Sequence, residues 1–265
     1  MPTEKRQRQK EGRAARQEAL QAYRRKAARR RQLITGVAVL AVVVVIVALL
    51  SSGKDKSQKV KAGTSTTARG ASTTAAPAKF ASSPCPPADG SAPRKIAFDG
   101  RPTTCIDPAR TYTAKFDTDV GAFTVALQSQ KAPETVNNFV FLARYHFYDG
   151  VKFHRVIPGF VVQGGDAAKG DGTGDAGYKI PDELPQKGEY KVGSVAMANS
   201  SRPNTGGSQF FIITGDQGVA LSPQYSLFGQ VTDGLDVVKK IEADGSPEGQ
   251  PKVPHQMVKV TITQA

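Results

Sequence analysis

The sequence has no tryptophan, only two cysteines and only three histidines among its 265 residues. A structural zinc site takes four cysteine or histidine ligands, and no histidine lies near Cys85 or Cys105 in the sequence. We therefore expect no metal site, and we also expect no bound cofactor.

Residues 148–228 hold the most distinctive motifs of the chain, and they lack the usual groups for covalent or proton-transfer chemistry. They contain no cysteine, no serine beside a basic partner and no paired acid–base carboxylates. Their polar residues include an arginine, two glutamines and an asparagine, set on short apolar runs with several aromatic residues. This composition suits the binding of a peptide rather than the breaking of a covalent bond.

The formal net charge of +13 first suggests a nucleic acid or an anionic membrane as a partner. Residues 1–31, however, hold 12 Lys and Arg against 3 Glu, so nine of the thirteen net positive charges lie there. The rest of the chain is not strongly basic, and we expect no nucleic-acid binding by it. We interpret residues 1–32 as a solvated basic tail; binding to anionic lipid headgroups, or less plausibly to RNA, is the alternative.

Residues 33–50 form an 18-residue run without a charge, which predicts a transmembrane helix. At 1.5 Å per residue the run would reach about 27 Å, close to the hydrocarbon thickness of a bilayer. Because Arg29, Arg30 and Arg31 precede it, we expect the N-terminus to be cytoplasmic and the bulk of the chain to be extracytoplasmic. A cleaved signal peptide is the alternative, although the basic region is long and no clear Ala-x-Ala follows.

Two segments separate this run from the C-terminal domain. Residues 51–80, rich in Ser, Thr, Ala, Gly and Lys, read as a flexible linker. Residues 81–110 contain Cys85 and Cys105 among many prolines. On the oxidising side of a membrane we expect these two cysteines to pair, stabilising the segment by about 3 kcal/mol; free thiols are the alternative.

Residues 111–265 have the pattern of a folded, mainly β domain. Apolar residues alternate with polar ones on both sides of a turn at 118–121, which predicts a β-hairpin, and Pro133 is placed to begin a helix. A second helix fits residues 235–241. Short apolar runs predict further strands near 151–157, 160–163, 192–197, 209–214, 227–231 and 258–262. Many short strands with two separated helices indicate a closed barrel with helical caps.

The motifs of this domain closely resemble those of the cyclophilin family of peptidyl-prolyl cis–trans isomerases. Residues 153–166, 197–199, 203–205 and 207–211 match the family in the right order, and residues 132–139 resemble its first helix. The similarity covers about residues 112–263. It implies a closed eight-stranded antiparallel β-barrel capped by two α-helices.

The resemblance also implies a mechanism and assigns residues to it. Rotation about an X–Pro amide has a barrier of about 18–20 kcal/mol and breaks no bond, so a catalyst must bind the twisted amide better than the planar forms. Arg155 would hydrogen-bond near the proline nitrogen and weaken amide resonance. The other implied residues are an apolar proline pocket of Phe160, Val161, Phe211 and Leu221, with Tyr225 at its mouth, and a peptide-binding set of Gln163, Ala198, Asn199, Ser200 and Gln209.

Strand geometry supports part of this assignment independently. Side chains alternate between the two faces of a strand, so Gln209 shares a face with Phe211, and Phe210 and Ile212 should point into the core. Val161 and Gln163 share a face for the same reason.

The chain departs from the best-known members of the family in three places. Tyr225 stands where they have histidine, Val219 or Ala220 where many have tryptophan, and residues 199–203 contain one extra residue. We predict that isomerase activity survives and that cyclosporin binding is weakened. The predicted function is isomerisation of X–Pro bonds in folding extracytoplasmic proteins. A membrane-tethered, non-catalytic binder of proline-containing segments, and a scaffold that acts through its basic tail, are the alternatives.

The remaining candidate motifs receive plainer interpretations. Residues 172–177 fit the GxGxxG string of dinucleotide-binding loops, but Asp171 and Asp175 would repel a pyrophosphate and no long helix follows, so we expect only a loop. We expect His154 to be packed rather than catalytic. His146 and His255 look isolated, and we interpret them as structural or solvated.

Overall fold

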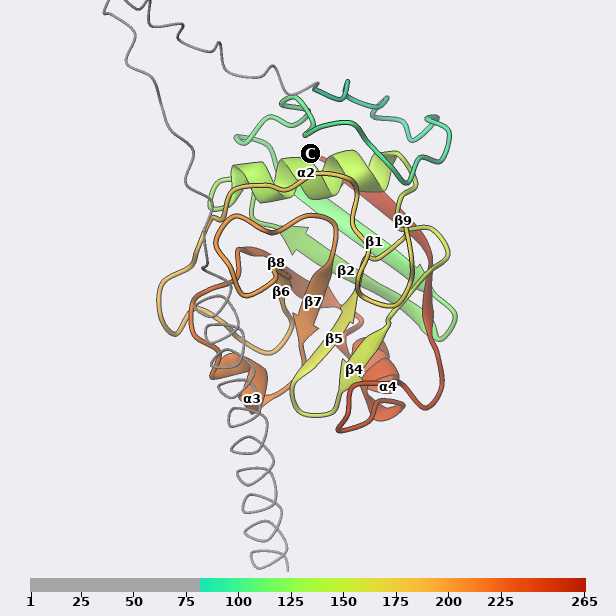
Figure 1. The fold of residues 1–265 in the computed structure, drawn as a ribbon, viewed down its shortest axis with the longest axis vertical. Coiled ribbons are helices and arrows are strands. Elements are labelled where there is room, and N and C mark those ends of the chain that lie inside the picture. The colour runs from blue at the N-terminus through green and yellow to red at the C-terminus, as the bar shows by residue number, and fades with distance from the viewer. Residues whose placement is uncertain (1–81) are drawn as a thin grey trace, which may run out of the picture. The chain divides into compact units, whose positions relative to one another are not determined.

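The computed structural model describes residues 82–265 (Figure 1). The predicted tail at 1–32, apolar segment at 33–50 and linker at 51–80 lie outside these described residues. Within residues 82–265, none of the helices has both the length and the apolar character that crossing a bilayer requires.

Residues 112–264 form nine strands and three helices. The strands are β1 (Tyr112–Thr118), β2 (Gly121–Leu127), β3 (Val151–Lys152), β4 (Arg155–Ile157), β5 (Val161–Gly164), β6 (Ser194–Met197), β7 (Phe210–Ile213), β8 (Leu227–Asp233) and β9 (Gln256–Gln264). The helices are α2 (Pro133–Arg144), α3 (Asp216–Val219) and α4 (Leu235–Ala243). The predicted hairpin and both predicted helices are present, and α3 is a short helix that the sequence pattern does not indicate.

All nine strands belong to one antiparallel sheet, in the order β3-β9-β1-β2-β8-β6-β7-β5-β4. The two end strands, β3 and β4, follow each other in the chain and are separated only by Phe153 and His154. The sheet must therefore curl until its two ends meet at this short connection. The fold is mainly β, as predicted.

The sheet differs in detail from the closed eight-stranded barrel that the resemblance implies. It has nine strands, and in the described part of the chain no ladder joins β3 to β4. The free edge of β4 is instead covered by the loop after α4: the Val156 amide donates to Gly249 O at 2.8 Å, and the Ser246 amide donates to Val156 O at 3.1 Å. This loop occupies the hydrogen-bonding groups that a closing strand would need.

The main core lies between the concave face of the sheet and α2. Tyr112, Ala114 and Phe116 alternate inward from β1, and Phe116 stacks on Phe123 of β2 with ring centroids 4.6 Å apart. Phe139 of α2 packs its ring onto this cluster. The alternation predicted for the hairpin is therefore confirmed.

Residues 82–110 cover the opposite side of α2, so the helix is buried on both sides (Figure 1). Phe98 joins the main core, with its ring centroid 4.8 Å from that of Phe141. The Lys95 amide donates to Tyr145 O at 2.9 Å, and the Phe98 amide donates to Ala176 O at 2.9 Å. Ten consecutive residues of α2, from Thr135 to Arg144, are buried as a result, which the apolar stripe at 136–143 alone does not predict.

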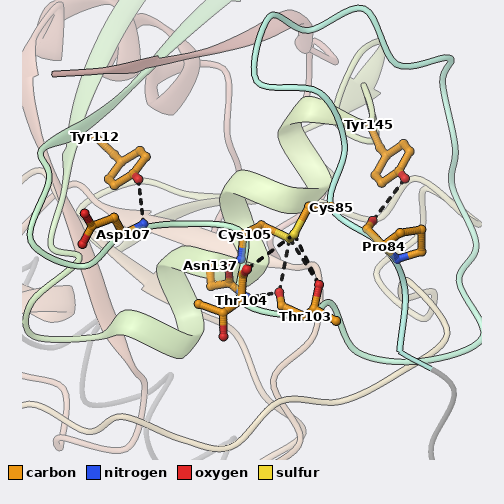
Figure 2. The surroundings of a disulfide bond; sticks show 9 residues. All are labelled: Pro84, Cys85, Thr103, Thr104, Cys105, Asp107, Tyr112, Asn137 and Tyr145. Carbon is orange, nitrogen blue, oxygen red and sulfur yellow. Dashed lines mark hydrogen bonds between the residues drawn. A yellow bond between two sulfur atoms is a disulfide. The ribbon is translucent and has the colours of Figure 1, made fainter.

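The predicted disulfide between Cys85 and Cys105 is confirmed and closes this segment into a loop (Figure 2). Its second cysteine is fixed to α2, because the Cys105 amide donates to Asn137 Oδ1 at 2.6 Å. The residue before the first cysteine contacts the end of the same helix, since the hydroxyl of Tyr145, directly after α2, donates to Pro84 O at 3.2 Å. The segment is thus joined to the domain on both sides of the disulfide.

Candidate active site

The candidate active site is built across β4, β5 and β7, on the face of the sheet opposite to the main core. The register pairs Arg155 with Gln163 and Gln163 with Phe211, so their side chains form a row across three strands. Phe210 and Ile212 belong to the main core, whereas Phe211 and Ile213 belong to a second apolar cluster on the other face. The facing predicted from strand alternation is confirmed.

Arg155 is held by a chain of side-chain hydrogen bonds. Its Nη1 donates to Gln163 Oε1 at 3.1 Å, and Gln163 Nε2 donates to Gln209 Oε1 at 3.1 Å. Gln209 Nε2 donates in turn to the carbonyl oxygens of Gly172 and Gly174, each at 2.8 Å. The guanidinium is therefore anchored through two amides to the backbone of the 172–174 loop, which limits its rotation.

A cavity of about 220 Å³ with an apolar wall opens beside Arg155. The predicted pocket residues line it together with Arg155: Phe160, Val161, Phe211, Leu221 and Tyr225. The guanidinium carbon lies 5.4 Å from the centroid of the Phe160 ring. Phe211 and Tyr225 meet edge to face, with centroids 5.2 Å apart. The cavity combines one cation with an apolar wall.

A second, more polar cavity of about 320 Å³ adjoins the first. Gln163, Ala198 and Asn199 line both cavities, whereas Ser200 and Gln209 line only the second. The residues predicted to bind a peptide backbone thus form a continuous wall along the two cavities. No residue of 82–110 lines either cavity, so the disulfide-bonded extension leaves them uncovered.

The charge of Arg155 has no carboxylate partner within residues 82–265. Burial lowers the pKa of its guanidinium, and the nearby Tyr225 works in the opposite direction. An arginine still remains protonated at neutral pH because its ordinary pKa is so high. The positive charge is therefore permanent and is directed at the cavity rather than neutralised by an ion pair.

The loop after α4 supports the strand that carries Arg155. Gly249 has a φ of +93°, and a side chain at this position would come within 3.2 Å of Arg155 Cγ. This close approach, together with the two backbone hydrogen bonds to Val156, fixes β4 against the loop. Only glycine provides both the backbone conformation and the space.

Three residues near the cavity escaped the sequence analysis. The Tyr190 hydroxyl donates to Tyr225 O at 2.7 Å and accepts from the Tyr225 amide at 3.1 Å, which fixes the wall of the cavity at Tyr225. Glu242 of α4 accepts from the Gly159 amide in the turn between β4 and β5, and Lys239 of the same helix donates to Glu242. Tyr190 lies outside any periodic segment, so no sequence pattern indicates its role. A Lys–Glu pair three residues apart on a helix is usually a solvated surface pair, so Lys239 and Glu242 gave no signal either.

The contacts fit the packed role predicted for His154 and a structural role for His146 and His255, but neither of the last two is isolated. His146 Nδ1 lies 2.9 Å from Asp149 Oδ2, and its Nε2 lies 2.9 Å from Gly90 O. His154 is packed: both ring nitrogens lack a hydrogen-bond partner among the described residues, and burial lowers its pKa while Asp166 opposes the shift. His255 is not isolated. Its ring lies between two carboxylates, with Nδ1 2.8 Å from Asp119 Oδ2 and Nε2 2.9 Å from Asp244 Oδ2. Residues 172–177 are a loop without a helix, as expected.

Comparison with known proteins agrees with this geometry. Residues 113–264 match the sequence model of the cyclophilin type peptidyl-prolyl cis-trans isomerase family. A peptidyl-prolyl cis-trans isomerase of Helicobacter pylori is 42% identical over 137 residues, which cover 51% of this chain and 82% of the relative. One from Synechococcus elongatus is 45% identical over 130 residues, which cover 48% of this chain and 87% of the relative.

Among solved structures, a cyclophilin type peptidyl-prolyl cis-trans isomerase of Cryptosporidium parvum, crystallised in the presence of the dipeptide Ala-Pro, is 29% identical. The match has a TM-score of 0.53 and covers 57% of this chain and 98% of that structure. The family match spans more than half of the chain and coincides with the curled sheet that carries Arg155. The chain therefore belongs to the cyclophilin family and is a peptidyl-prolyl cis–trans isomerase.

Proposed function

We propose that the apolar cavity binds the proline ring of an extended polypeptide and that Arg155 is the catalytic residue for rotation of the preceding amide. The observation that carries this proposal is the position of the guanidinium at the wall of a cavity lined by Phe160, Phe211 and Leu221. A proline ring placed there brings its amide nitrogen to the guanidinium. The Cryptosporidium relative was crystallised in the presence of Ala-Pro, a proline-containing dipeptide.

The chemistry follows from the change in the amide during rotation. In the planar forms the nitrogen lone pair is delocalised into the carbonyl group, whereas in the twisted form it is localised on nitrogen and accepts a hydrogen bond. A guanidinium N–H directed at this nitrogen favours the twisted form over both planar forms, so it lowers the barrier. The hydrogen bond to Gln163 holds Arg155 in place before the substrate arrives, which limits the reorganisation that catalysis would otherwise require.

The neighbouring polar wall gives the substrate backbone its direction. Gln163, Asn199 and Gln209 carry side-chain amides, and Ala198 and Ser200 lie along the same wall. Tyr225 closes one side of the proline cavity through its contact with Phe211. Since Tyr225 replaces a histidine and tryptophan is absent, we propose that cyclosporin binds more weakly than to tryptophan-bearing members.

We also propose that the enzyme is anchored in a cell membrane by residues 33–50, with its N-terminus cytoplasmic, and acts on extracytoplasmic proteins as they fold. The uncharged run preceded by three arginines supports the orientation. The disulfide between Cys85 and Cys105 suits an oxidising compartment. Residues 1–32 would then lie beside the anionic headgroups of the inner leaflet.

The catalytic assignment is tested by the rate of prolyl isomerisation in a proline-containing peptide. We expect Arg155→Ala to lower kcat/KM about 100-fold, as removal of one transition-state donor does in other enzymes. The matched control is Arg110→Ala, which removes an exposed arginine whose nearest carboxylate is Asp107 at 3.9 Å. If Arg155→Ala is folded and as active as the unaltered protein, Arg155 is not catalytic. A protein that binds proline peptides but does not accelerate their isomerisation would be the non-catalytic binder.

A further inference from the structure

The turn between β4 and β5 carries Phe160 and is bound by α4. The Phe160 amide donates to Ile157 O at 3.1 Å, and Gly159 has a φ of +76°, as the third residue of a type II turn requires. Such a turn leaves the Gly159 amide without a partner of its own. Glu242 Oε1 accepts from this amide at 2.6 Å, across 83 residues of sequence.

Lys239 of α4 connects Glu242 to the end of β7. Lys239 Nζ donates to Glu242 Oε2 at 2.8 Å and also to the carbonyl oxygen of Thr214, at the end of β7. The Thr214 amide donates to Phe160 O at 3.0 Å. These hydrogen bonds form a closed ring that joins the turn, the end of β7 and α4. The backbone of Phe160 is part of this ring.

Glu242 is only 8% exposed, which is unusual for a carboxylate on a surface helix. Burial acts to raise its pKa, but the hydrogen bonds from Lys239 and from the Gly159 amide outweigh burial, so the pKa is lowered. The group stays ionised at neutral pH. Its Oε1 thus gives the Gly159 amide a charged acceptor, and charge-assisted hydrogen bonds are stronger than neutral ones.

The other side of the turn has no room to move. A side chain at Gly215 would lie 2.6 Å from Gly159 O, and one at Gly218 would lie 2.6 Å from Phe160 O. The helix α3 therefore contacts the turn backbone directly. The turn is confined between α3 and the carboxylate of Glu242 in α4. This confinement also holds the Phe160 ring, whose centroid lies 5.4 Å from the Arg155 guanidinium carbon.

We propose that Glu242, paired with Lys239, is a positioning residue for prolyl isomerisation: it holds the Gly159 amide and thereby fixes the Phe160 ring beside Arg155. This inference rests on the proposed roles of Arg155 and Phe160. Glu242 lines neither cavity, so it acts only through the turn.

The test uses the full chain with variants that separate the hydrogen bond from the charge. We expect Glu242→Ala to lower kcat/KM about tenfold, because the cavity wall moves relative to Arg155. Glu242→Gln keeps an acceptor for Gly159 and should stay within about threefold of the unaltered enzyme. The matched control is Asp236→Ala, which removes an exposed carboxylate of the same helix, 3.4 Å from Lys240, and should leave the rate unchanged.

A spectroscopic readout separates positioning from general stability. The chain has 12 phenylalanines, so we would label it with 4-fluorophenylalanine and assign the fluorine resonance of Phe160 from a Phe160→Leu variant. Glu242→Ala should shift this resonance, whereas Glu242→Gln and Asp236→Ala should not. If Glu242→Ala does not fold, Glu242→Asp replaces it, since its shorter side chain stays near Lys239 but no longer reaches Gly159, and it should give the same shift and loss of rate.

Two results would overturn the inference. One is a folded Glu242→Ala or Glu242→Asp enzyme with an unchanged rate and an unchanged Phe160 resonance. The other is equal damage by Glu242→Gln and Glu242→Ala, which would assign the effect to lost charge rather than to the held amide. If instead Arg155→Ala leaves the rate unaffected, the proposed catalysis fails, while the Phe160 resonance still shows whether Glu242 positions the turn.

Discussion

At the scale of single residues, His255 shows how one side chain connects distant parts of the chain. It is 5% exposed and precedes β9, while its two carboxylate partners lie in the turn between β1 and β2 and directly after α4. A ring with a carboxylate at each nitrogen must donate from both nitrogens, so it binds these partners best as the imidazolium. Burial lowers the pKa of His255, but the hydrogen bonds that it donates to Asp244 and Asp119 outweigh burial, so the pKa is raised.

The raised pKa of His255 predicts a pH-dependent stability. The folded state holds the proton more tightly than the unfolded state, whose ordinary value is 6.5. The stabilisation is therefore complete below pH 6.5 and is lost as the pH rises through the higher folded-state pKa. We expect the free energy of unfolding of the unaltered protein to exceed that of His255→Asn by a margin that shrinks as the pH rises above 6.5, measured by urea denaturation at several pH values.

The comparison with His255→Asn removes the contribution of the other buried histidine. Burial lowers the pKa of His154, so its effect has the opposite sign and destabilises the fold as the pH falls below 6.5. Because His154 is present in both proteins, its effect cancels in the difference. A margin that stays constant from pH 5 to pH 9, or that grows with pH, would contradict the prediction for His255.

At the scale of elements, residues 82–110 behave as part of the domain rather than as an appendage. Phe98 is 5% exposed and contacts three aromatic rings, those of Phe141, Tyr145 and Tyr178. Lys95 Nζ lies 4.9 Å from the centroid of the same ring. Removal of this one side chain would leave a cavity on the outer side of α2.

We predict that Phe98→Ala lowers the free energy of unfolding by about 3 kcal/mol, the usual cost of truncating a buried phenylalanine. Urea denaturation of the two proteins measures the difference. The matched control is Ile96→Ala, because Ile96 lies two residues away in the same segment and is exposed. A loss no larger than that of the control would mean that the segment contributes little to the fold. Since the segment lines neither cavity, we expect the isomerisation rate of folded Phe98→Ala to be unchanged.

Much of this architecture could be predicted from the sequence. The hairpin of β1 and β2 follows from clean alternation, α2 from Pro133, and α4 from its apolar spacing. The facing of Phe210 and Phe211 followed from strand period alone. Because the family motifs are local, they also identified residues that do line the two cavities.

The remaining features depend on contacts that local patterns do not contain. The run 151–157 was predicted as one strand. Instead, Phe153 turns into the core and divides the run into β3 and β4. These two short strands lie at opposite ends of the strand order. The four-residue helix α3 is too short for any period to show. The sequence gives no reason to distinguish Glu242 from a surface residue that pairs with Lys239, because its contact with Gly159 forms only when α4 packs on the turn.

At the scale of the whole molecule, the position of the described domain relative to a membrane is the main expectation to test. If residues 33–50 span a membrane with the N-terminus inside, protease added to intact cells that express the full chain should degrade residues 82–265. An antibody to the C-terminal domain measures the loss, and a cytoplasmic protein that stays intact is the control. A domain that is protected until the cells are lysed would contradict both the proposed orientation and the proposed extracytoplasmic substrates.

The disulfide has a mechanical consequence for a domain joined to a longer chain at its N-terminal side. Tension that enters at Ser82 reaches Cys85 after three residues and passes through the sulfur bridge to Cys105. Ser83 also bonds to the far end of the loop, since its amide donates to Arg101 O at 3.0 Å and its carbonyl oxygen accepts from the Thr103 amide at 3.2 Å, so these contacts share the load. The force reaches the domain at two points: the hydrogen bond from the Tyr145 hydroxyl to Pro84 O, and the hydrogen bond from the Cys105 amide to Asn137 of α2. Pulling on the tether would thus load the two ends of the disulfide loop and their attachments to α2 and Tyr145, whereas Phe98, in the middle of the loop, lies off the direct path.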